Sequence, residues 1–212
     1  MGSGVSYLII GANGSMGQRY QAVLKHLGKT VVCADVETPL EKVLNAADWA
    51  DGVILATPTE SHVDYLKWLA PQIDTPILCE KPVTKSMDDL HLLFDLLLDH
   101  QTNFTMMLQY QMLDSDKIGS SHYNYFRTGK DGLIWDCFQI IGLARGPVHV
   151  DNTSPIWTCR LNGKTLSLSD MDKAYVDFVA QWIEKPGHDL AWLMDMHQKV
   201  NNYLIKDYQT RW

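Results

Sequence analysis

A glycine-rich stretch near the start of the chain has the residues needed to hold a pyrophosphate. It reads Gly-Ala-Asn-Gly-Ser-Met-Gly over residues 11–17, between an apolar run at residues 7–10 and a stretch with helical spacing. Glycine lets the backbone turn tightly and approach phosphate oxygens, and the helix N-terminus offers free N–H groups. A structural turn without a ligand is the alternative. We expect a dinucleotide to be bound here by Gly11, Asn13, Gly14, Ser15, Met16 and Gly17.

An acidic residue follows the second apolar run at a spacing that suits ribose recognition. Asp35 directly follows residues 30–34 and lies 18 positions after Gly17. A carboxylate there accepts both ribose hydroxyls of an adenosine and repels a 2′-phosphate. Neither Val36 nor Glu37 supplies the arginine that such a phosphate requires. The sequence therefore predicts NAD as the cofactor, with a solvated loop aspartate as the alternative interpretation.

Two more polar segments follow apolar runs, where parallel strands present ligand-binding side chains. Residues 53–56 precede Thr-Pro-Thr-Glu-Ser-His, and residues 77–79 precede Glu-Lys-Pro. Oxidation of an alcohol by hydride transfer needs a group that takes or relays the hydroxyl proton and stabilises developing negative charge. Lys81 fits this role because burial readily lowers the pKa of a lysine. The alternative is a solvated lysine that pairs with Glu80.

Together these segments resemble the glucose-fructose oxidoreductase, inositol dehydrogenase and MocA (Gfo/Idh/MocA) family of NAD(P)-dependent sugar and cyclitol dehydrogenases. The resemblance covers about residues 5–112 closely and returns weakly at 133–143 and in the last two helical stretches. It implies that Lys81 approaches the substrate hydroxyl and favours a cis bond between Lys81 and Pro82. It also implies that Thr57, Pro58 and His62 line the nicotinamide side of the cofactor groove, and we expect Ala56, Glu80 and Lys81 to bind the cofactor as well.

The second half departs from the family pattern. Family enzymes carry D-x-G-x-H on a helix, where the His is the acid/base and the Asp helps hold the substrate. Here residues 136–140 read Asp-Cys-Phe-Gln-Ile, so Ile140 replaces the His. We expect Asp136 and Gln139 to position the substrate, although glutamine cannot transfer a proton. His122 or His149 could supply the proton from elsewhere, but a surface or structural role is favoured for both.

Alternation of apolar runs with helical patterns predicts an α/β Rossmann domain with a parallel sheet over residues 1–108. The expected strands are 7–10, 30–34, 53–56, 77–79 and 104–108, and the expected helices begin near 15, 39, 60 and 86. Gly28 is expected to adopt a left-handed conformation at the end of the first helix. The pattern Thr38-Pro39-Leu40-Glu41 predicts a capping box, with Thr38 as the cap of the second helix.

Residues 109–212 predict a reduced α+β domain for substrate binding or oligomerisation. The expected elements are a small sheet from residues 120–126, 148–150 and a hairpin at Asn162-Gly163, and helices at 133–143, 169–184 and 188–205. Family members usually run well over 300 residues, so the chain looks like a shortened member. Family assembly through the open face of this sheet predicts a homodimer or larger, with aromatic residues there from Tyr123, Tyr125 and Trp157.

Composition excludes several classes of function. The chain has 212 residues, a net charge of −7 and no basic run, so nucleic acid is not an expected partner. No apolar stretch reaches the ~20 residues of a membrane span, and no leader pattern begins the chain, which predicts a cytoplasmic protein. The four cysteines form no C-x-x-C pair and no zinc pattern with histidine. We expect them to be buried, reduced thiols.

Three functions remain open at this point. The first is an NAD-dependent oxidoreductase that acts on a small polyol, sugar or related hydroxy compound. The second is a dinucleotide-binding sensor or assembly protein that has lost the acid/base histidine. The third is a reductase of another unsaturated substrate, such as a tetrapyrrole or an imine, which needs no histidine. The intact Glu80-Lys81-Pro82 segment favours the first, and Ile140 favours the second.

Overall fold

The computed structural model describes residues 6–113, 121–124, 137–144, 148–151, 158–161 and 164–209. The chain divides into two compact units. The first contains Met1–Met107 and Val179–Leu190, and the second contains Leu108–Phe178 and Ala191–Trp212. The first unit therefore includes a short segment from near the C-terminus as well as the whole N-terminal half.

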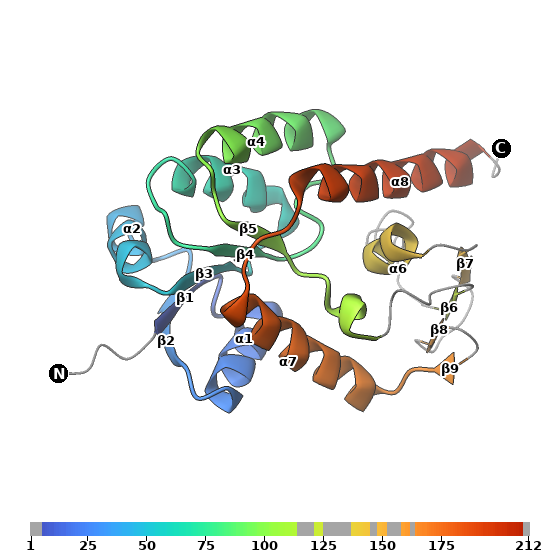
Figure 1. Ribbon diagram of the computed structural model, residues 1–212, viewed down its shortest axis with the longest axis horizontal. Helices are drawn as coiled ribbons and strands as arrows, with labels where there is room; N and C mark the ends of the chain where they lie inside the picture. Colours follow the sequence, from blue (N-terminus) through green and yellow to red (C-terminus); the bar gives the residue numbers. More distant parts are fainter. Residues whose placement is uncertain are drawn as a thin grey trace. The chain divides into compact units, whose positions relative to one another are not determined.

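The first unit is a parallel sheet with helices on both faces (Figure 1), which confirms the predicted α/β Rossmann fold. Its order is β2-β1-β3-β4-β5. The strands are β1 (Ser6–Ile10), β2 (Thr30–Ala34), β3 (Gly52–Leu55), β4 (Ile77–Cys79) and β5 (Phe104–Met106). The helices are α1 (Ser15–His26), α2 (Leu40–Trp49), α3 (Thr59–Leu69) and α4 (Met87–Asp99). The described residues of β3, β4 and β5 are all buried, as expected for parallel strands between helical layers.

The predicted end of α1 is confirmed, whereas the predicted start of α2 is not. Gly28 has φ +69° directly after α1, which confirms its predicted left-handed conformation. The predicted capping box of α2 is wrong. Pro39 is the N-cap and no side chain caps this helix. The Thr38 hydroxyl instead accepts a 3.0 Å hydrogen bond from the N–H of Asp35, because the chain turns immediately after β2.

Two predictions about burial need correction. Cys33 is exposed, whereas Cys79, Cys137 and Cys159 are buried. The reason is that β2 is an edge strand, so its apolar sequence does not imply two covered faces. In α3 the helical spacing of Val63, Leu66 and Leu69 predicts that all three face inward. The buried side chain of the first turn is instead His62, and Val63 is half-buried beside a cavity of about 450 Å³.

The segment Val179–Leu190 closes the β5 edge of the sheet. The N–H of His188 donates to the Phe104 carbonyl at 2.8 Å, and the N–H of Met106 donates to His188 Nδ1 at 3.3 Å. Trp182 packs against Tyr7 with ring centroids 5.6 Å apart. The Trp182 ring also fills the space over Gly52, where an added Cβ would lie 2.6 Å from it. This part of the chain thus completes the core of the first unit.

The second unit contains a small mixed sheet of order β7-β6-β8-β9, as predicted. β8 and β9 pair antiparallel with Leu161 opposite Lys164, as expected for the two strands of the predicted hairpin, and its turn residues 162–163 lie outside the described residues. The strands are β6 (Ser121–Asn124), β7 (Val148–Asp151), β8 (Thr158–Leu161) and β9 (Lys164–Thr165). The helices are η1 (Gln109–Leu113), α6 (Phe138–Leu143), α7 (Leu168–Glu184) and α8 (Leu190–Gln209), the last two shared with the first unit at one end.

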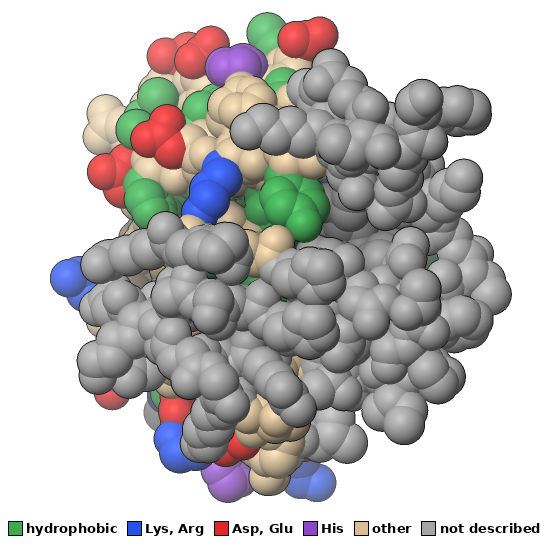
Figure 2. All heavy atoms as spheres, turned by 90° about the vertical axis from the view of Figure 1, so that its right-hand side faces the viewer, with side chains coloured by type: hydrophobic (Ala, Val, Ile, Leu, Met, Phe, Trp, Pro, Cys, Tyr) green, Lys and Arg blue, Asp and Glu red, His purple; other side chains and the backbone are tan. Residues whose placement is uncertain are grey.

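Acidic and basic side chains are interspersed among the described residues on the face shown in Figure 2. No helix in the described part of the chain is both long and apolar enough to cross a membrane. The same residues hold no group of three histidine, cysteine, aspartate or glutamate side chains placed to bind a metal ion.

Candidate active site

Two of the three motif glycines are required by the fold itself. Gly11 has φ +87°, and an added Cβ would lie 2.9 Å from the backbone of Ala56. An added Cβ on Gly17 would lie 2.2 Å from the Gly11 carbonyl oxygen. Contacts this short between a side chain and backbone cannot be relieved by a change of rotamer. Gly11 therefore allows the loop to approach the backbone after β3, and Gly17 allows the first turns of α1 to pack against the loop.

Gly14 is different, because nothing in the described part of the chain requires it to be glycine. Its φ of −68° suits any residue, and an added Cβ would meet only the Gly11 carbonyl oxygen, at an ordinary 3.4 Å. Gly14 is exposed at the start of α1. The absent side chain leaves open space above the loop, which is the cradle that a pyrophosphate needs.

The first turn of α1 is also left open to an anion. The helix has no side-chain cap and no acidic residue in its first turn. By contrast, α4 is capped by the Ser86 hydroxyl, which accepts from the N–H of Asp89, and it carries Asp88 and Asp89 in its first turn. Helix α2 has Glu41 and α3 has Glu60 in the same position. No side chain of α1 itself thus compensates the positive end of this helix, which favours a bound phosphate.

Asp35 lies at the end of β2 with its carboxylate held against the glycine loop. Oδ2 accepts a 2.7 Å hydrogen bond from the N–H of Asn13, and Oδ1 accepts from the N–H of Val36 at 2.9 Å. Each carboxylate oxygen can accept a second hydrogen bond, so the group can still receive two ribose hydroxyls. The structure therefore brings the predicted phosphate loop and the predicted ribose ligand together.

The Glu80-Lys81-Pro82 segment follows β4 and carries a cis Lys81–Pro82 bond, as expected. Glu80 is 7% exposed, accepts from the Tyr20 hydroxyl at 2.9 Å, and accepts from the N–H of Lys81 at 3.1 Å. The Lys81 side chain is half-buried, and its ammonium has no ion-pair partner among the described residues. An ammonium placed this way can interact with a substrate oxygen.

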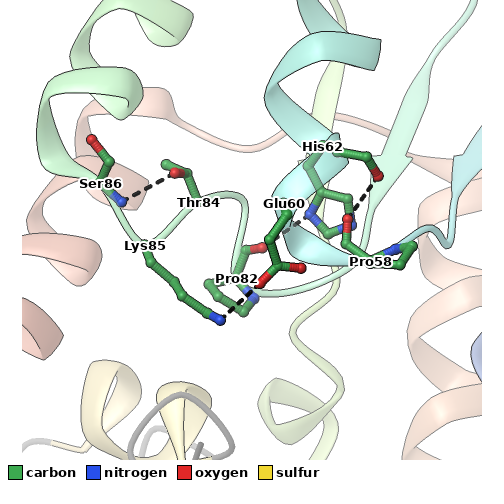
Figure 3. Close-up of polar contacts among 8 residues, drawn as sticks. Pro58, Glu60, His62, Pro82, Thr84, Lys85 and Ser86 are labelled. Atoms are coloured by element: carbon green, nitrogen blue, oxygen red, sulfur yellow. Dashed lines mark hydrogen bonds and ion pairs between the residues drawn. The ribbon is translucent and has the colours of Figure 1, made fainter. Parts of the chain in front are cut away.

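His62 joins the turns that follow β3 and β4 (Figure 3). It is 1% exposed, with Nε2 2.8 Å from the Thr57 carbonyl oxygen and Nδ1 3.0 Å from the Pro82 carbonyl oxygen. Burial lowers the pKa of His62, against the opposing effect of these carbonyls and of Glu80. A neutral imidazole has a single N–H, so it donates to one carbonyl, whereas only an imidazolium donates to both. Because both nitrogens face the backbone, His62 acts on the site through the two turns.

Two further contacts hold the segment after Pro82 in place (Figure 3). The Lys85 ammonium pairs with the Glu60 carboxylate at 3.0 Å, which links this segment to the start of α3. The N–H of Ser86 donates to the Thr84 hydroxyl at 3.1 Å. The predicted cofactor-binding residues between positions 56 and 81 therefore lie in the turns at the carboxyl ends of β3 and β4, or hydrogen-bond to these turns as His62 does.

In the second unit, the amide of Gln139, which was expected to position the substrate, is used in hydrogen bonds within the protein. Gln139 is fully buried, accepts at Oε1 from the N–H of Tyr110 at 3.1 Å, and donates from Nε2 to the Gln109 side chain. Its amide thus fastens η1 to α6. Asp136 lies outside the described residues, as do the side chains of His122 and His149.

Sequence reasoning missed the side chains of α1 that support the site. Besides Tyr20, Gln18 donates to the Asn13 carbonyl at 3.0 Å and Gln21 donates to the Ala12 carbonyl at 2.8 Å. Gln18 and Gln21 are three residues apart and so lie on one face of α1, which could have drawn attention to them. Nothing in the sequence indicates which carbonyls they reach.

The comparisons with known proteins support the fold. No family model and no curated protein matches the chain. Among solved structures, the WlbA dehydrogenase of Thermus thermophilus, in complex with NAD and UDP-GlcNAcA, has 12% sequence identity and a TM-score of 0.69, covering 93% of this chain and 94% of that one. A myo-inositol dehydrogenase of Corynebacterium glutamicum has 13% identity, coverage of 93% and 95%, and a TM-score of 0.69.

The dehydrogenase MviM of Clostridium difficile gives 13% identity, coverage of 96% and 99%, and a TM-score of 0.72. A structure described as a Gfo/Idh/MocA family oxidoreductase is also among the neighbours. The resemblance predicted from the motifs is thus confirmed at the level of the fold.

Proposed function

We propose that the chain is an NAD-dependent oxidoreductase that transfers a hydride to or from a small polyol, sugar or related hydroxy compound. The observation that carries the proposal is Gly14, whose missing side chain serves no contact within the protein. Two further features favour a bound dinucleotide: the uncapped first turn of α1 suits the phosphates, and the carboxylate of Asp35 suits the adenosine ribose. Asp35 favours NAD because a 2′-phosphate would be repelled there.

Each residue of the site has a distinct part in the proposed reaction. The nicotinamide supplies the hydride acceptor or donor when the cofactor is bound. In the reducing direction the Lys81 ammonium donates a proton to the carbonyl oxygen as the hydride reaches the carbon, and in the oxidising direction the Lys81 amine takes the hydroxyl proton back and so becomes the ammonium that stabilises negative charge on that oxygen. Glu80, held by Tyr20, fixes the backbone N–H of Lys81. His62 holds the Thr57 and Pro82 turns at a constant separation.

The resemblance and the solved neighbours support the proposed substrate class. One of these structures is a myo-inositol dehydrogenase, and another contains UDP-GlcNAcA. Inositol and the sugar of UDP-GlcNAcA are both polyhydroxylated. We infer that Asp136 positions such a substrate, and that the buried amide of Gln139 supports α6.

A second candidate is a dinucleotide-binding protein without turnover. The observation that favours it is Ile140, which is fully buried at the position where the resemblance expects the acid/base histidine. A buried isoleucine neither donates nor accepts a proton. Under this reading the glycine loop and Asp35 keep their function, and Lys81 becomes a binding residue.

One experiment separates the two candidates. The purified chain is titrated with NADH, followed by fluorescence. It is then assayed for NADH formation from NAD with a panel of polyols, sugars and sugar acids, and for NADH consumption with their oxidised forms. Binding together with turnover supports the oxidoreductase. Binding without turnover, in either direction of the reaction, supports the second candidate, and absence of binding refutes both.

A further inference from the structure

The sheet of the first unit has one closed edge and one open edge. Residues 187–188 cover β5, whereas β2 pairs only with β1 in the part of the chain that the structure describes (Figure 1). In the usual dinucleotide-binding order 3-2-1-4-5-6, another strand lies outside the second one. Here the connection from β2 to β3 contains only α2, so that place in the sheet is free.

The backbone groups on this open edge can be identified. The Ala34 carbonyl accepts from the N–H groups of Gly11 and Ala12 at 2.9 and 3.1 Å, so Ala34 faces β1. Backbone groups alternate in direction along a strand, so those of Val31 and Cys33 face outward. At the two ends of this edge the outward N–H groups already have partners within the chain. The N–H of Asp35 donates to the Thr38 hydroxyl, and the N–H of Lys29 donates to the Leu24 carbonyl.

The side chains leave this edge unprotected. The strand reads Thr-Val-Val-Cys-Ala, with no charge and no proline, the residues that usually keep sheet edges from pairing. Val32 is 41% exposed and Cys33 is exposed. Of the six exposed large apolar residues among the described residues of the first unit, four belong to β2 or to the stretch that follows it: Val32, Val36, Leu40 and Trp49.

We propose that β2 pairs antiparallel with β2 of a second copy of this chain. In each copy the outward groups are the N–H and C=O of Val31 and of Cys33. One register pairs all of them, with Val31 opposite the partner's Cys33 and Val32 opposite the partner's Val32 on the two-fold axis. Registers that centre on Val31 or Cys33 leave half of these groups unpaired. The chosen register also sets Lys29 opposite the partner's Asp35 at both ends, which matches opposite charges. The proposal does not depend on the proposed function.

Disulfide trapping tests both the pairing and its register. In a Cys33→Ser background, Val32→Cys places two thiols at directly opposite positions, within the Cα separation that a disulfide allows. We expect most of this variant to run as a covalent dimer after mild oxidation. Val31→Cys in the same background should stay unlinked, because its thiols lie diagonally apart. Leu92→Cys, on an exposed position of α4, is the matched control for random collisions.

The mass in solution provides the second measurement. The wild-type chain should have a dimeric mass by light scattering at micromolar concentration, and Val32→Lys should be monomeric while Leu92→Lys stays dimeric. A monomeric wild-type chain overturns the proposal, as does cross-linking at position 32 no greater than at position 92. A dimer that survives Val32→Lys without cross-linking at position 32 also overturns it, since another surface, such as the small sheet of the second unit, then forms the dimer. If Val32→Lys does not fold, as judged by circular dichroism, the cross-linking result decides.

Discussion

The Tyr20 hydroxyl donates a 2.9 Å hydrogen bond to the Glu80 carboxylate, and this contact joins α1 to the turn that carries Lys81. Tyr20 is fully buried and Glu80 is 7% exposed. A carboxylate placed there needs donors, because burial of an unpaired charge costs several kcal/mol, on the order of magnitude found for buried ions in proteins. The helix that begins at the phosphate loop thus also stabilises the candidate catalytic turn.

Removal of the Tyr20 hydroxyl should therefore destabilise the first unit. We expect Tyr20→Phe to lower the free energy of unfolding by about 1–3 kcal/mol, the cost of leaving a buried acceptor without its donor. Urea denaturation measures this value. Tyr65→Phe on α3 is the control, with an expected change within about 0.5 kcal/mol. Equal effects of the two substitutions would show that the hydrogen bond to Glu80 does not matter.

Gly14→Val should abolish NADH binding in a chain that remains folded. The Cβ meets only an ordinary 3.4 Å contact within the protein, but it occupies the space expected for the pyrophosphate. Fluorescence titration measures the binding and circular dichroism the fold. Gly28→Ala is the control, because it imposes strain at φ +69° far from the cradle and should leave the affinity for NADH unchanged. Normal NADH affinity in folded Gly14→Val would refute the site.

The choice between NADH and NADPH should depend on Asp35. The wild-type chain should bind NADH more tightly, because the carboxylate accepts ribose hydroxyls and repels a 2′-phosphate. Asp35→Ala should weaken NADH binding and narrow the difference, measured by parallel titrations with both nucleotides. Asp51→Ala, at the opposite end of the sheet where its carboxylate accepts from the N–H of Ser6, is the control. Equal affinities of the wild-type chain for both nucleotides would contradict this prediction.

The sequence predicted the elements of the first unit well because strands between two helical layers are uniformly apolar and glycine marks their ends. It failed where a contact depends on a distant segment. Cys33 belongs to a run as apolar as β3, and only the strand order reveals that it lies at an edge. Trp182 and His188 complete a sheet that ends some 75 residues earlier, and no local pattern indicates this.

The candidate site shows the same division. The residues that belong to a local motif, such as Gly11, Gly14 and Asp35, could be found from spacing alone. The role of His62 could not, because its two carbonyl partners come from turns after different strands. Tyr20 and Glu80 are 60 residues apart, so their pairing depends on the crossing of α1 over the sheet.

Acid should weaken the fold between about pH 6.5 and pH 4. Burial lowers the pKa of His188 and of His197 to about 4, from 6.5 for a free histidine. In this range the unfolded chain binds protons that the folded chain does not, so the free energy of unfolding falls as the pH falls. Each histidine contributes up to about 3 kcal/mol, and the loss levels off below pH 4. Urea denaturation at several pH values between 7.5 and 4 measures the slope.

His188→Asn isolates one of these contributions. An asparagine oxygen can accept the hydrogen bond from the N–H of Met106 that Nδ1 accepts now, and it does not titrate. The variant should therefore keep most of its stability at pH 7.5 and lose less of it on acidification than the wild-type chain. His91→Asn, at an exposed position on α4, should leave the slope unchanged. An unchanged slope in His188→Asn would mean that this histidine is not held neutral by burial.

If the chain turns over a hydroxy compound, Lys81 should be its most sensitive single position. Lys81→Met keeps much of the side chain's length and apolar stem but removes the ammonium that faces the reacting oxygen. NADH binding should persist, because the glycine loop and Asp35 hold the phosphates and the adenosine ribose. Turnover should fall by about 100-fold or more, the scale for loss of a positioned acid/base group.

Lys85→Met provides the matched control for Lys81→Met. It removes a neighbouring ammonium that is exposed and paired with Glu60, so turnover should change only a few-fold. Replacement of His122 or His149 by alanine should also have much smaller effects than Lys81→Met. If Lys81→Met keeps most of the wild-type rate while NADH binding is intact, the lysine is not the catalytic group. The role implied by the family resemblance is then wrong for this chain, and the Glu-Lys-Pro turn serves only to bind the dinucleotide.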